Sequence, residues 1–442
     1  MTDYSTDLSS VKRISHSDMD APETSRAAHS RIPLRDISPD QVSGLTREEV
    51  PAGWSRQTKH KKTPSPLANT NRSPRLKSYK GPLTSIQKLW RYFLTFKNLV
   101  FRPKIVKTPP IHLQLESTDA CNLHCTSCSR DQFIKKPNIL SEQLWKKVID
   151  EIRPTNINVS GIGEPFLHPN LFEIIAYAKK NDAAINCATN FTRIRKNHRT
   201  IVESGISQLK ISIDAANAET YRIIRGEDAF DEILENIREI NRWKEELGID
   251  NPSLRFNFAV QALNFKQAPE LVRLAKEVGV SGIYFQYLEY VDMEDRKAML
   301  TAEMTREDLY RTLKEADQTA QQEGIITNLN IWWRDFDIFW NKMRPISKFE
   351  PNTRPCLFPT FSTWLGADGW IRPCPIMPWT LDEGRMGNLA EDSFEEIWNN
   401  DKYQELRAAL KRGERPTRSC KTCVPQSLYN ILYLKTNLLP KS

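Results

Sequence analysis

The stretch that decides the fold is residues 111–128, which read IHLQLESTDACNLHCTSC. Its first half alternates apolar and polar side chains, and this alternation predicts a β-strand. Its second half places Cys121, Cys125 and Cys128 close together. We therefore expect the three cysteines in the loop that follows the carboxyl end of a strand.

Strand-like and helix-like segments alternate after this loop as far as residue 288. The predicted strands are 156–160, 183–188, 208–213, 253–262 and 282–288, and the predicted helices are 141–152, 170–180, a short one near 200, 218–247 and 267–278. Such alternation is typical of parallel β/α units with right-handed crossovers. Six strands are too few for an eight-stranded barrel, so we expect an α/β fold with a partial (β/α)6 barrel.

The N-terminal part differs from the rest in charge. Residues 1–110 hold 20 Lys and Arg against 9 Asp and Glu, whereas residues 111–442 hold 43 against 46. Residues 1–82 are predicted to be a disordered basic tail. A solvated tail is the simpler interpretation, and attraction to anionic lipid or RNA is the alternative. Residues 83–107 are predicted to form an amphipathic helix and linker, which either packs on the next domain or lies on a membrane surface.

The remaining boundaries follow from the same patterns. Residues 108–300 form the expected core, 301–345 a connecting helical and aromatic segment, and 346–442 a smaller domain that carries the last four cysteines. The near-neutral body argues against a nucleic-acid partner there. Neither a signal peptide nor a membrane-spanning stretch is evident. We therefore expect a cytoplasmic protein whose cysteines are reduced thiols or metal ligands.

The cysteine triad is suited to an iron–sulfur cluster. Clusters are usually held by four thiolates, so three cysteines without a fourth nearby can bind three irons of a cubane and leave one iron open. An open position distinguishes a reactive metal centre from a structural one. The alternative is a zinc site completed by His124 or by a distant residue.

A glycine-rich motif follows the second predicted strand, at Gly161-Ile-Gly163-Glu164-Pro. Glycines at this position allow a ligand to approach the backbone closely. The carboxylate can accept a hydrogen bond from an ammonium group. A glycine-rich turn of this kind also occurs without any ligand, so the motif alone is a weak signal.

Another motif, residues 211–214 (ISID), ends the fourth predicted strand. Tyr221 and Arg225 stand in the helix after it. An arginine suits a carboxylate because its planar fork donates two parallel hydrogen bonds. Ser212 and Asp214 are alternatively simple helix caps.

The C-terminal cysteines form a second set, Cys356, Cys374, Cys420 and Cys423. Four thiolates complete a ligand set with no open position, for an iron–sulfur cluster or, alternatively, for a structural zinc. The eighth cysteine, Cys187, lies within the third predicted strand, where a small buried thiol is expected.

These motifs together resemble the radical S-adenosylmethionine (SAM) superfamily, whose signature is CxxxCxxC after the first barrel strand. In that family the open iron of a [4Fe–4S] cluster binds the amino and carboxylate groups of SAM. One-electron reduction of SAM then yields methionine and a 5′-deoxyadenosyl radical. The resemblance implies SAM contacts from Gly161, Gly163, Glu164, Asn190, Ser212 and Arg225.

The roles within this set also come from the resemblance. Gly163 would contact SAM through its backbone and Glu164 would bind the amino group, as in the family's GGEP motif. Ser212 and Arg225 would bind the SAM carboxylate, and Asn190 would line the same site.

The C-terminal set is similar to the SPASM/twitch extension of many radical SAM enzymes. Together the two resemblances cover about residues 108–430. Residues 424–442 contain no further cysteine, so we expect one auxiliary [4Fe–4S] cluster rather than two.

The expected function is a hydrogen abstraction that leads to net oxidation of a small molecule or carbohydrate. The auxiliary cluster would accept the electron, and a flavodoxin or ferredoxin would supply electrons for SAM cleavage. Maturation of a ribosomally made peptide is one alternative, and an iron–sulfur electron-transfer or scaffold protein without radical chemistry is another. Candidate pocket residues at the last barrel strand and beyond are Gln286, Tyr287, Glu289, Trp332, Trp333 and Arg334.

Overall fold

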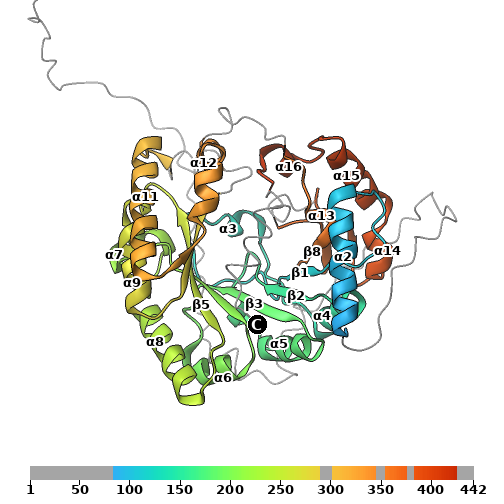
Figure 1. Cartoon of the computed structure of the whole chain (residues 1–442). Coiled ribbons are helices and arrows are strands. Elements are labelled where there is room, and N and C mark those ends of the chain that lie inside the picture. Colours follow the sequence, from blue (N-terminus) through green and yellow to red (C-terminus); the bar gives the residue numbers. More distant parts are fainter. Residues whose placement is uncertain (1–82, 289–300, 345–353, 376–382, 426–442) are drawn as a thin grey trace, which may run out of the picture. The chain divides into compact units, whose positions relative to one another are not determined.

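The computed structural model describes residues 83–288, 301–344, 354–375 and 383–425. The expected basic tail, residues 1–82, lies outside these ranges. Six parallel strands form the centre of one curved sheet (Figure 1). They are β1 (His112–Leu115), β2 (Asn156–Val159), β3 (Ala184–Thr189), β4 (Gln208–Ser212), β5 (Ser253–Val260) and β6 (Gly282–Tyr287). Each strand pairs in parallel with the next one along the chain, so the predicted partial barrel is confirmed.

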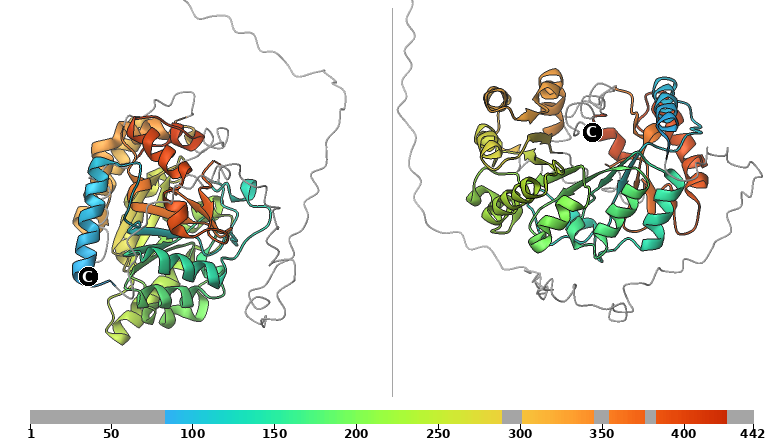
Figure 2. Two further views of the ribbon diagram at one scale, coloured as in Figure 1. Left: turned by 90° about the vertical axis from the view of Figure 1, so that its right-hand side faces the viewer. Right: turned by 60° about the horizontal axis from the view of Figure 1, so that its bottom comes forward.

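Helices connect these strands and cover the outer face of the sheet (Figures 1 and 2). They are α4 (Glu142–Ile152), α5 (Leu171–Lys180), α6 (His198–Glu203), α7 (Ala218–Arg225), α8 (Phe230–Leu247), α9 (Ala268–Glu277) and, after β6, α11 (Arg306–Glu323). Each of the longer helices buries an apolar stripe against the strands, as α4 does with Trp145, Val148 and Ile152.

The sequence-based prediction of one long helix over 218–247 is wrong at its centre. Gly226 ends α7 with a backbone φ of 76°, a left-handed conformation that glycine adopts without steric cost. A Cβ at this position would lie 3.3 Å from the His124 carbonyl oxygen. The break therefore allows α7 to end close to the cysteine loop.

The sheet continues beyond both edges of the six central strands, to ten strands within the described residues. A short strand β7 (Ile326–Thr327) pairs with β6, and α12 (Leu329–Met343) follows it. At the other edge, β8 (Ser362–Leu365) pairs in parallel with β1, and β9 (Trp370–Arg372) and β10 (Gly387–Asn388) continue antiparallel. The cysteine-containing C-terminal region therefore extends the same sheet that carries the cysteine triad.

The helices of this C-terminal region pack beside β8–β10. They are α13 (Phe358–Phe361), α14 (Phe394–Trp398), α15 (Asp401–Lys411) and α16 (Arg418–Thr422). A buried arginine, Arg407, joins α15 to its surroundings by donating to the Pro359 carbonyl at 2.8 Å and to Asn399 Oδ1 at 3.0 Å. The expected helix within residues 83–107 is α2 (Ser85–Phe101), which packs against α13 (Figure 1).

The two faces of the central strands differ sharply in polarity. One face is apolar and lies under the helices, as Leu113, Ile157 and Ile211 do. Alternate positions carry polar side chains, because successive residues of a strand point to opposite faces. These positions hold His112, Gln114, Asn156, Asn158, Asn186, Lys210, Arg255, Asn257 and Tyr284. The inner face of the partial barrel is therefore polar.

Candidate active site

The cysteine loop follows β1 directly, as the sequence predicts. Backbone N–H groups lie near two of its sulfurs: Leu123 N is 3.5 Å from Cys121 Sγ, and Arg130 N is 3.4 Å from Cys128 Sγ. All three cysteines of the triad are free thiols of intermediate exposure. Such N–H contacts stabilise negative charge on sulfur, as a cluster ligand requires.

The loop is held from both sides by hydrogen bonds. Asp119 accepts hydrogen bonds from the backbone and side-chain nitrogens of Asn138, at 2.5 and 2.7 Å. The backbone of Glu164 donates to the Ala120 carbonyl at 2.7 Å. The segment before Cys121 is thus fixed to Asn138, near the other end of the same β1–α4 loop, and to the loop after β2.

The glycines of the second motif allow this close approach of the two loops. A Cβ at Gly163 would lie 2.3 Å from the Thr118 carbonyl oxygen and 2.5 Å from that of Ala120. A Cβ at Gly161 would lie 2.1 Å from Glu116 Oε1. Neither position has room for a larger residue unless its neighbours move.

Glu164 is buried and already has protein partners. Its carboxylate accepts hydrogen bonds from Phe166 N at 3.1 Å, Thr189 Oγ1 at 2.7 Å and Asn190 N at 2.6 Å. Burial raises the pKa of this carboxyl above its usual value, although these hydrogen bonds oppose the shift. Glu164 therefore connects the loop after β2 to the end of β3.

The third motif approaches the cysteine loop through Arg225. Its Nη1 lies 3.6 Å from Cys125 Sγ, and its Nη2 lies 2.7 Å from Asp214 Oδ2. Asp214 is buried and also accepts a hydrogen bond from Ala259 N at 2.6 Å. Asp214 is not a helix cap, since Asn217 caps α7. It holds the guanidinium of Arg225 beside the triad.

Asn190 and Ser212 complete the sequence-predicted set. Asn190 Nδ2 lies 3.9 Å from Cys121 Sγ and donates to Asn122 Oδ1 at 3.0 Å. Ser212 is the last residue of β4, paired in register with Asn257 of β5. The ends of β2, β3 and β4 thus bring Glu164, Asn190 and Arg225 to the cysteine loop.

The electrostatics of the triad fit a metal cluster. Burial, together with the nearby Glu164 carboxylate, raises the pKa of Cys121 to about 12. Burial also raises the pKa of Cys128. Thiols in such a site become anionic when a metal ion compensates their charge. In the described part of the chain, no three His, Cys, Asp or Glu side chains converge on a single ion, but a cubane distributes its thiolates over separate irons.

His124, the alternative fourth ligand of a zinc site, is engaged elsewhere. Its Nδ1 lies 2.8 Å from Asp131 Oδ2, at the start of the short helix α3 (Arg130–Phe133). This contact with an exposed carboxylate favours three thiolate ligands over a Cys3His zinc site.

The C-terminal cysteines come from three separate places in the chain, because Cys420 and Cys423 form a CxxC pair. Cys356 precedes α13, Cys374 follows β9, Cys420 lies in α16 and Cys423 follows it. Cys356 and Cys420 are close enough to interact electrostatically, and burial raises the pKa of Cys356 to about 11. All four are free thiols of intermediate exposure, which suits ligands of a second cluster.

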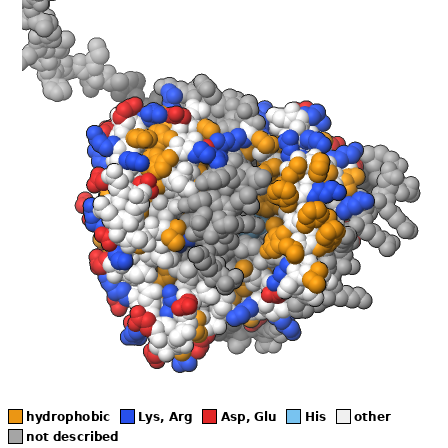
Figure 3. All heavy atoms as spheres, viewed as in Figure 1, with side chains coloured by type: hydrophobic (Ala, Val, Ile, Leu, Met, Phe, Trp, Pro, Cys, Tyr) orange, Lys and Arg blue, Asp and Glu red, His pale blue; other side chains and the backbone are white. Residues whose placement is uncertain are grey.

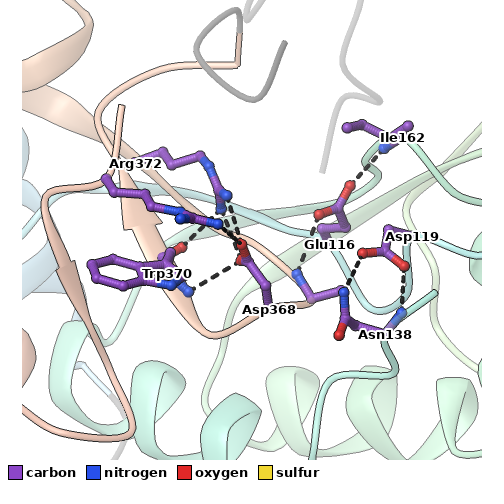
Figure 4. Close-up of polar contacts among 9 residues, drawn as sticks. Glu116, Asp119, Asn138, Ile162, Asp368, Trp370 and Arg372 are labelled. Atoms are coloured by element: carbon purple, nitrogen blue, oxygen red, sulfur yellow. Dashed lines mark hydrogen bonds and ion pairs between the residues drawn. The ribbon is translucent and has the colours of Figure 1, made fainter. Parts of the chain in front are cut away.

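Glu116, which the sequence analysis did not single out, joins the two cysteine regions (Figure 4). It follows β1 and accepts hydrogen bonds from Ile162 N at 2.6 Å and from Ala367 N at 3.2 Å. In the same turn after β8, Asp368 binds Arg372 through both carboxylate oxygens, at 2.9 and 2.7 Å. An acidic residue directly after β1 was the available signal.

The predicted pocket residues in β6 and beyond it make several contacts with the rest of the protein. Trp332 is buried in the core and donates to the Phe285 carbonyl at 3.0 Å. Trp333 donates to Asp317 Oδ2 at 2.7 Å. Tyr287 stacks on Phe339. These contacts give the aromatic residues packing roles, and Glu289 lies outside the described residues.

Two family sequence models match this chain at the regions just described. The Radical SAM superfamily matches residues 115–246, and the SPASM iron–sulfur cluster-binding domain matches residues 356–424. The chain therefore contains a Radical SAM domain at residues 115–246 and a SPASM domain at residues 356–424. A [4Fe–4S] cluster with SAM, and auxiliary iron–sulfur ligation in the SPASM domain, are the cofactors that these domains imply.

Individual relatives and a solved structure agree with this assignment. A tungsten-containing aldehyde ferredoxin oxidoreductase cofactor-modifying protein of Pyrococcus furiosus is 25% identical over 333 residues, 71% of this chain and 86% of that protein. An AdoMet-dependent heme synthase of Methanosarcina barkeri is 27% identical over 335 residues, 70% of this chain and 86% of that protein. SuiB of Streptococcus suis, crystallised with precursor peptide SuiA, superposes with a TM-score of 0.54 at 14% identity, covering 74% of this chain and 72% of SuiB.

Proposed function

We propose that this radical SAM enzyme abstracts hydrogen from a small polar molecule and oxidises it, with one auxiliary cluster as electron acceptor. When bound, the triad's cluster supplies one electron to SAM, which yields methionine and a 5′-deoxyadenosyl radical. The observation that carries the proposal is the convergence of Glu164, Asn190 and Arg225 on a three-cysteine loop. A protein that only carries electrons or assembles clusters does not need a buried site that binds the amino and carboxylate groups of an amino acid.

Each residue has a defined part in this proposal. Cys121, Cys125 and Cys128 hold three irons and leave the fourth for the methionine moiety of SAM. Arg225, oriented by Asp214, binds the SAM carboxylate beside Ser212, and Glu164 accepts from the amino group with Gly163 alongside it. Asn190 lines the same site.

A small polar substrate is supported by the inner face of the barrel. Lys210 of β4 and Arg255 of β5 are register partners on this face. Lys210 donates to Asn158 Oδ1 at 3.0 Å, and burial lowers its pKa to about 8. No Asp or Glu occurs within β2–β6, so a substrate with an anionic group suits this interior. Two relatives of this chain are named a cofactor-modifying protein and a heme synthase.

The C-terminal cysteines are proposed to hold one auxiliary [4Fe–4S] cluster. The chain has 8 cysteines; three form the triad and Cys187 is buried in β3, so four remain for one full ligand set. A cluster with four cysteine ligands has no open iron for substrate. Electron transfer is therefore the favoured role of the auxiliary cluster. A flavodoxin or ferredoxin is the proposed electron donor for SAM cleavage.

A peptide maturase is the second candidate, because SuiB of similar fold was crystallised with its precursor peptide. The first test is common to both candidates. The protein is reconstituted anaerobically with iron and sulfide, reduced with dithionite and incubated with SAM, and 5′-deoxyadenosine is measured by mass spectrometry.

The matched variants for this test are Cys125→Ala and Cys187→Ala. Wild type and Cys187→Ala should form deoxyadenosine, whereas Cys125→Ala should form none above background. Full cluster loading without deoxyadenosine in the wild type would instead favour the electron-transfer or scaffold function. To separate the two candidates, SAM cleavage is measured with a small anionic metabolite and with a peptide. Acceleration by the metabolite supports small-molecule oxidation, and acceleration by the peptide supports peptide maturation.

A further inference from the structure

α2 is packed on the protein with its apolar face outward. Its polar residues Arg91 and Thr95 are buried, with 0% and 3% of their surfaces exposed. Ile86, Leu89 and Phe93 on the opposite side are 81%, 71% and 54% exposed. An amphipathic helix of a globular protein normally turns its apolar stripe to the core. Here the arrangement is reversed.

The outward side carries a continuous apolar surface. Figure 3 shows hydrophobic side chains gathered over α2, with Lys and Arg side chains around them. Its large exposed members, which we call the α2 stripe, are Ile86, Leu89, Trp90, Tyr92, Phe93, Phe96, Val100 and Phe101. A contiguous surface of eight large, exposed apolar side chains marks an interaction site.

The reversed orientation is enforced by specific contacts of the inward side. Arg91 donates to the Pro110 carbonyl at 2.9 Å, to those of Pro109 and Ile152 at 3.3 Å each, and to that of Arg153. Two of these carbonyls belong to the end of α4, where a cation is favoured by the helix dipole. These hydrogen bonds of Arg91 therefore hold α2 with the α2 stripe facing outward.

The charge around α2 identifies its partner. Residues 83–115 contain six Lys and Arg and no Asp or Glu. On and just after α2, Lys97, Lys104 and Lys107 are exposed. Lys88 forms an ion pair with Asp182. A helix with Trp, Phe and Leu on one side and cations nearby has the composition of a membrane-surface helix, and clustered Lys and Arg attract anionic lipids.

We propose that α2 binds this enzyme to the surface of an anionic lipid bilayer, with the α2 stripe in the interfacial layer. None of the described helices is long and apolar enough to cross a bilayer, so the association is peripheral. Arg91 anchors α2 to Pro109 and Pro110 at the amino end of β1, whereas the cysteine triad follows the carboxyl end. Membrane contact through α2 is therefore separate from SAM chemistry.

The test is co-sedimentation of the full-length protein with sucrose-loaded vesicles. Vesicles of pure phosphatidylcholine are compared with vesicles that also contain phosphatidylglycerol, at low and high salt. The wild type should bind the anionic vesicles, and salt should weaken the binding. The double variant Leu89→Ser/Phe93→Ser should bind at least about tenfold more weakly, because two stripe side chains no longer enter the interface.

The matched control is Leu263→Ser/Ile326→Ser, two side chains exposed to a similar degree away from α2. It should bind vesicles like the wild type. Both double variants should keep the wild-type melting temperature and deoxyadenosine formation, which separates loss of membrane binding from misfolding and from failure of the proposed function.

Three results would overturn the proposal. The first is no vesicle binding together with a dimer, by light scattering, that Leu89→Ser/Phe93→Ser dissociates, since the stripe would then pair with a second copy. The second is vesicle binding by Leu89→Ser/Phe93→Ser equal to that of the wild type, because the stripe would then have no part in the binding. The third is equal binding to neutral and anionic vesicles, which would remove the role of the basic residues.

Discussion

The two cysteine regions of this protein are held in different ways. The triad lies in one short loop, fixed by local hydrogen bonds from Asn138 and Glu164. The C-terminal set comes from three places between residues 356 and 423, which the tertiary fold brings together. A local ligand set can form as soon as β1 and its neighbours pair, whereas the distant set requires the completed sheet. The comparison predicts that damage to one region leaves the other partly functional.

The largest expected effect comes from breaking the C-terminal set alone. Cys420→Ala should lose about half of the bound iron and all substrate oxidation, because the proposed electron acceptor is gone. SAM cleavage in the absence of substrate should stay within about tenfold of the wild type, because the triad is intact. Iron analysis and deoxyadenosine measurement check both expectations. Equal loss of both activities would show that the two regions are not separable.

The next effect concerns the residue that orients Arg225. Asp214→Asn removes the charge that holds the guanidinium, so SAM should bind roughly 10- to 100-fold more weakly, as expected for a lost charged hydrogen bond. Isothermal titration of SAM into the reconstituted protein measures this. Asp337→Asn, which breaks the exposed Arg306 pair at 2.6 Å, should leave SAM affinity unchanged.

An effect on stability rather than on SAM binding is expected at Glu116, where the two regions meet. Burial raises its pKa from 4.5 to about 7, so the folded state binds its proton more tightly than the unfolded state. The resulting stability is fully present below about pH 4.5 and is lost as pH rises through 7, a change of about 3 kcal/mol. Glu116→Gln should flatten this pH dependence in anaerobic urea denaturation. If the wild type and Glu116→Gln lost stability equally between pH 5 and pH 8, the raised pKa of the Glu116 carboxyl would be contradicted.

The smallest effect is expected where the loop after β2 meets the cysteine loop. Gly163→Ala places a Cβ against the Thr118 and Ala120 carbonyls and should destabilise the protein by about 1–3 kcal/mol. Gly248→Asn is the matched control, since nothing lies within 4 Å of a Cβ there and asparagine tolerates the positive φ. Thermal melting compares the two. A Gly163→Ala variant as stable as Gly248→Asn would show that the loop contact is loose.

Much of the fold was predictable from the sequence for a physical reason. The alternation of residues 111–116 and the periodicity of 141–152 are local signals, and they correspond to β1 and α4. The break at Gly226 was missed because both flanking segments have helical periodicity. The pairing of β8 with β1 joins residues about 250 positions apart, and no local pattern encodes such a contact.

The candidate site was predictable to the same extent. Cysteine spacing located the triad, and the resemblance to the radical SAM superfamily pointed to Glu164 and Arg225. The roles of Glu116 and Asp214 were not predictable, because a buried carboxylate is identified by its partners in space. The orientation of α2 was also beyond the sequence, since an amphipathic pattern does not state which face the protein covers.

The measurement that tests the central claim most directly is an electron paramagnetic resonance titration with SAM. It uses the dithionite-reduced Cys420→Ala variant, which keeps only the triad's cluster. We predict that SAM changes the signal of this cluster, because SAM binds its open iron, and that Asp214→Asn in the same background requires more SAM for the change. A fully loaded cluster whose signal is the same with and without saturating SAM would contradict the assignment of Cys121, Cys125 and Cys128 as a SAM-binding site.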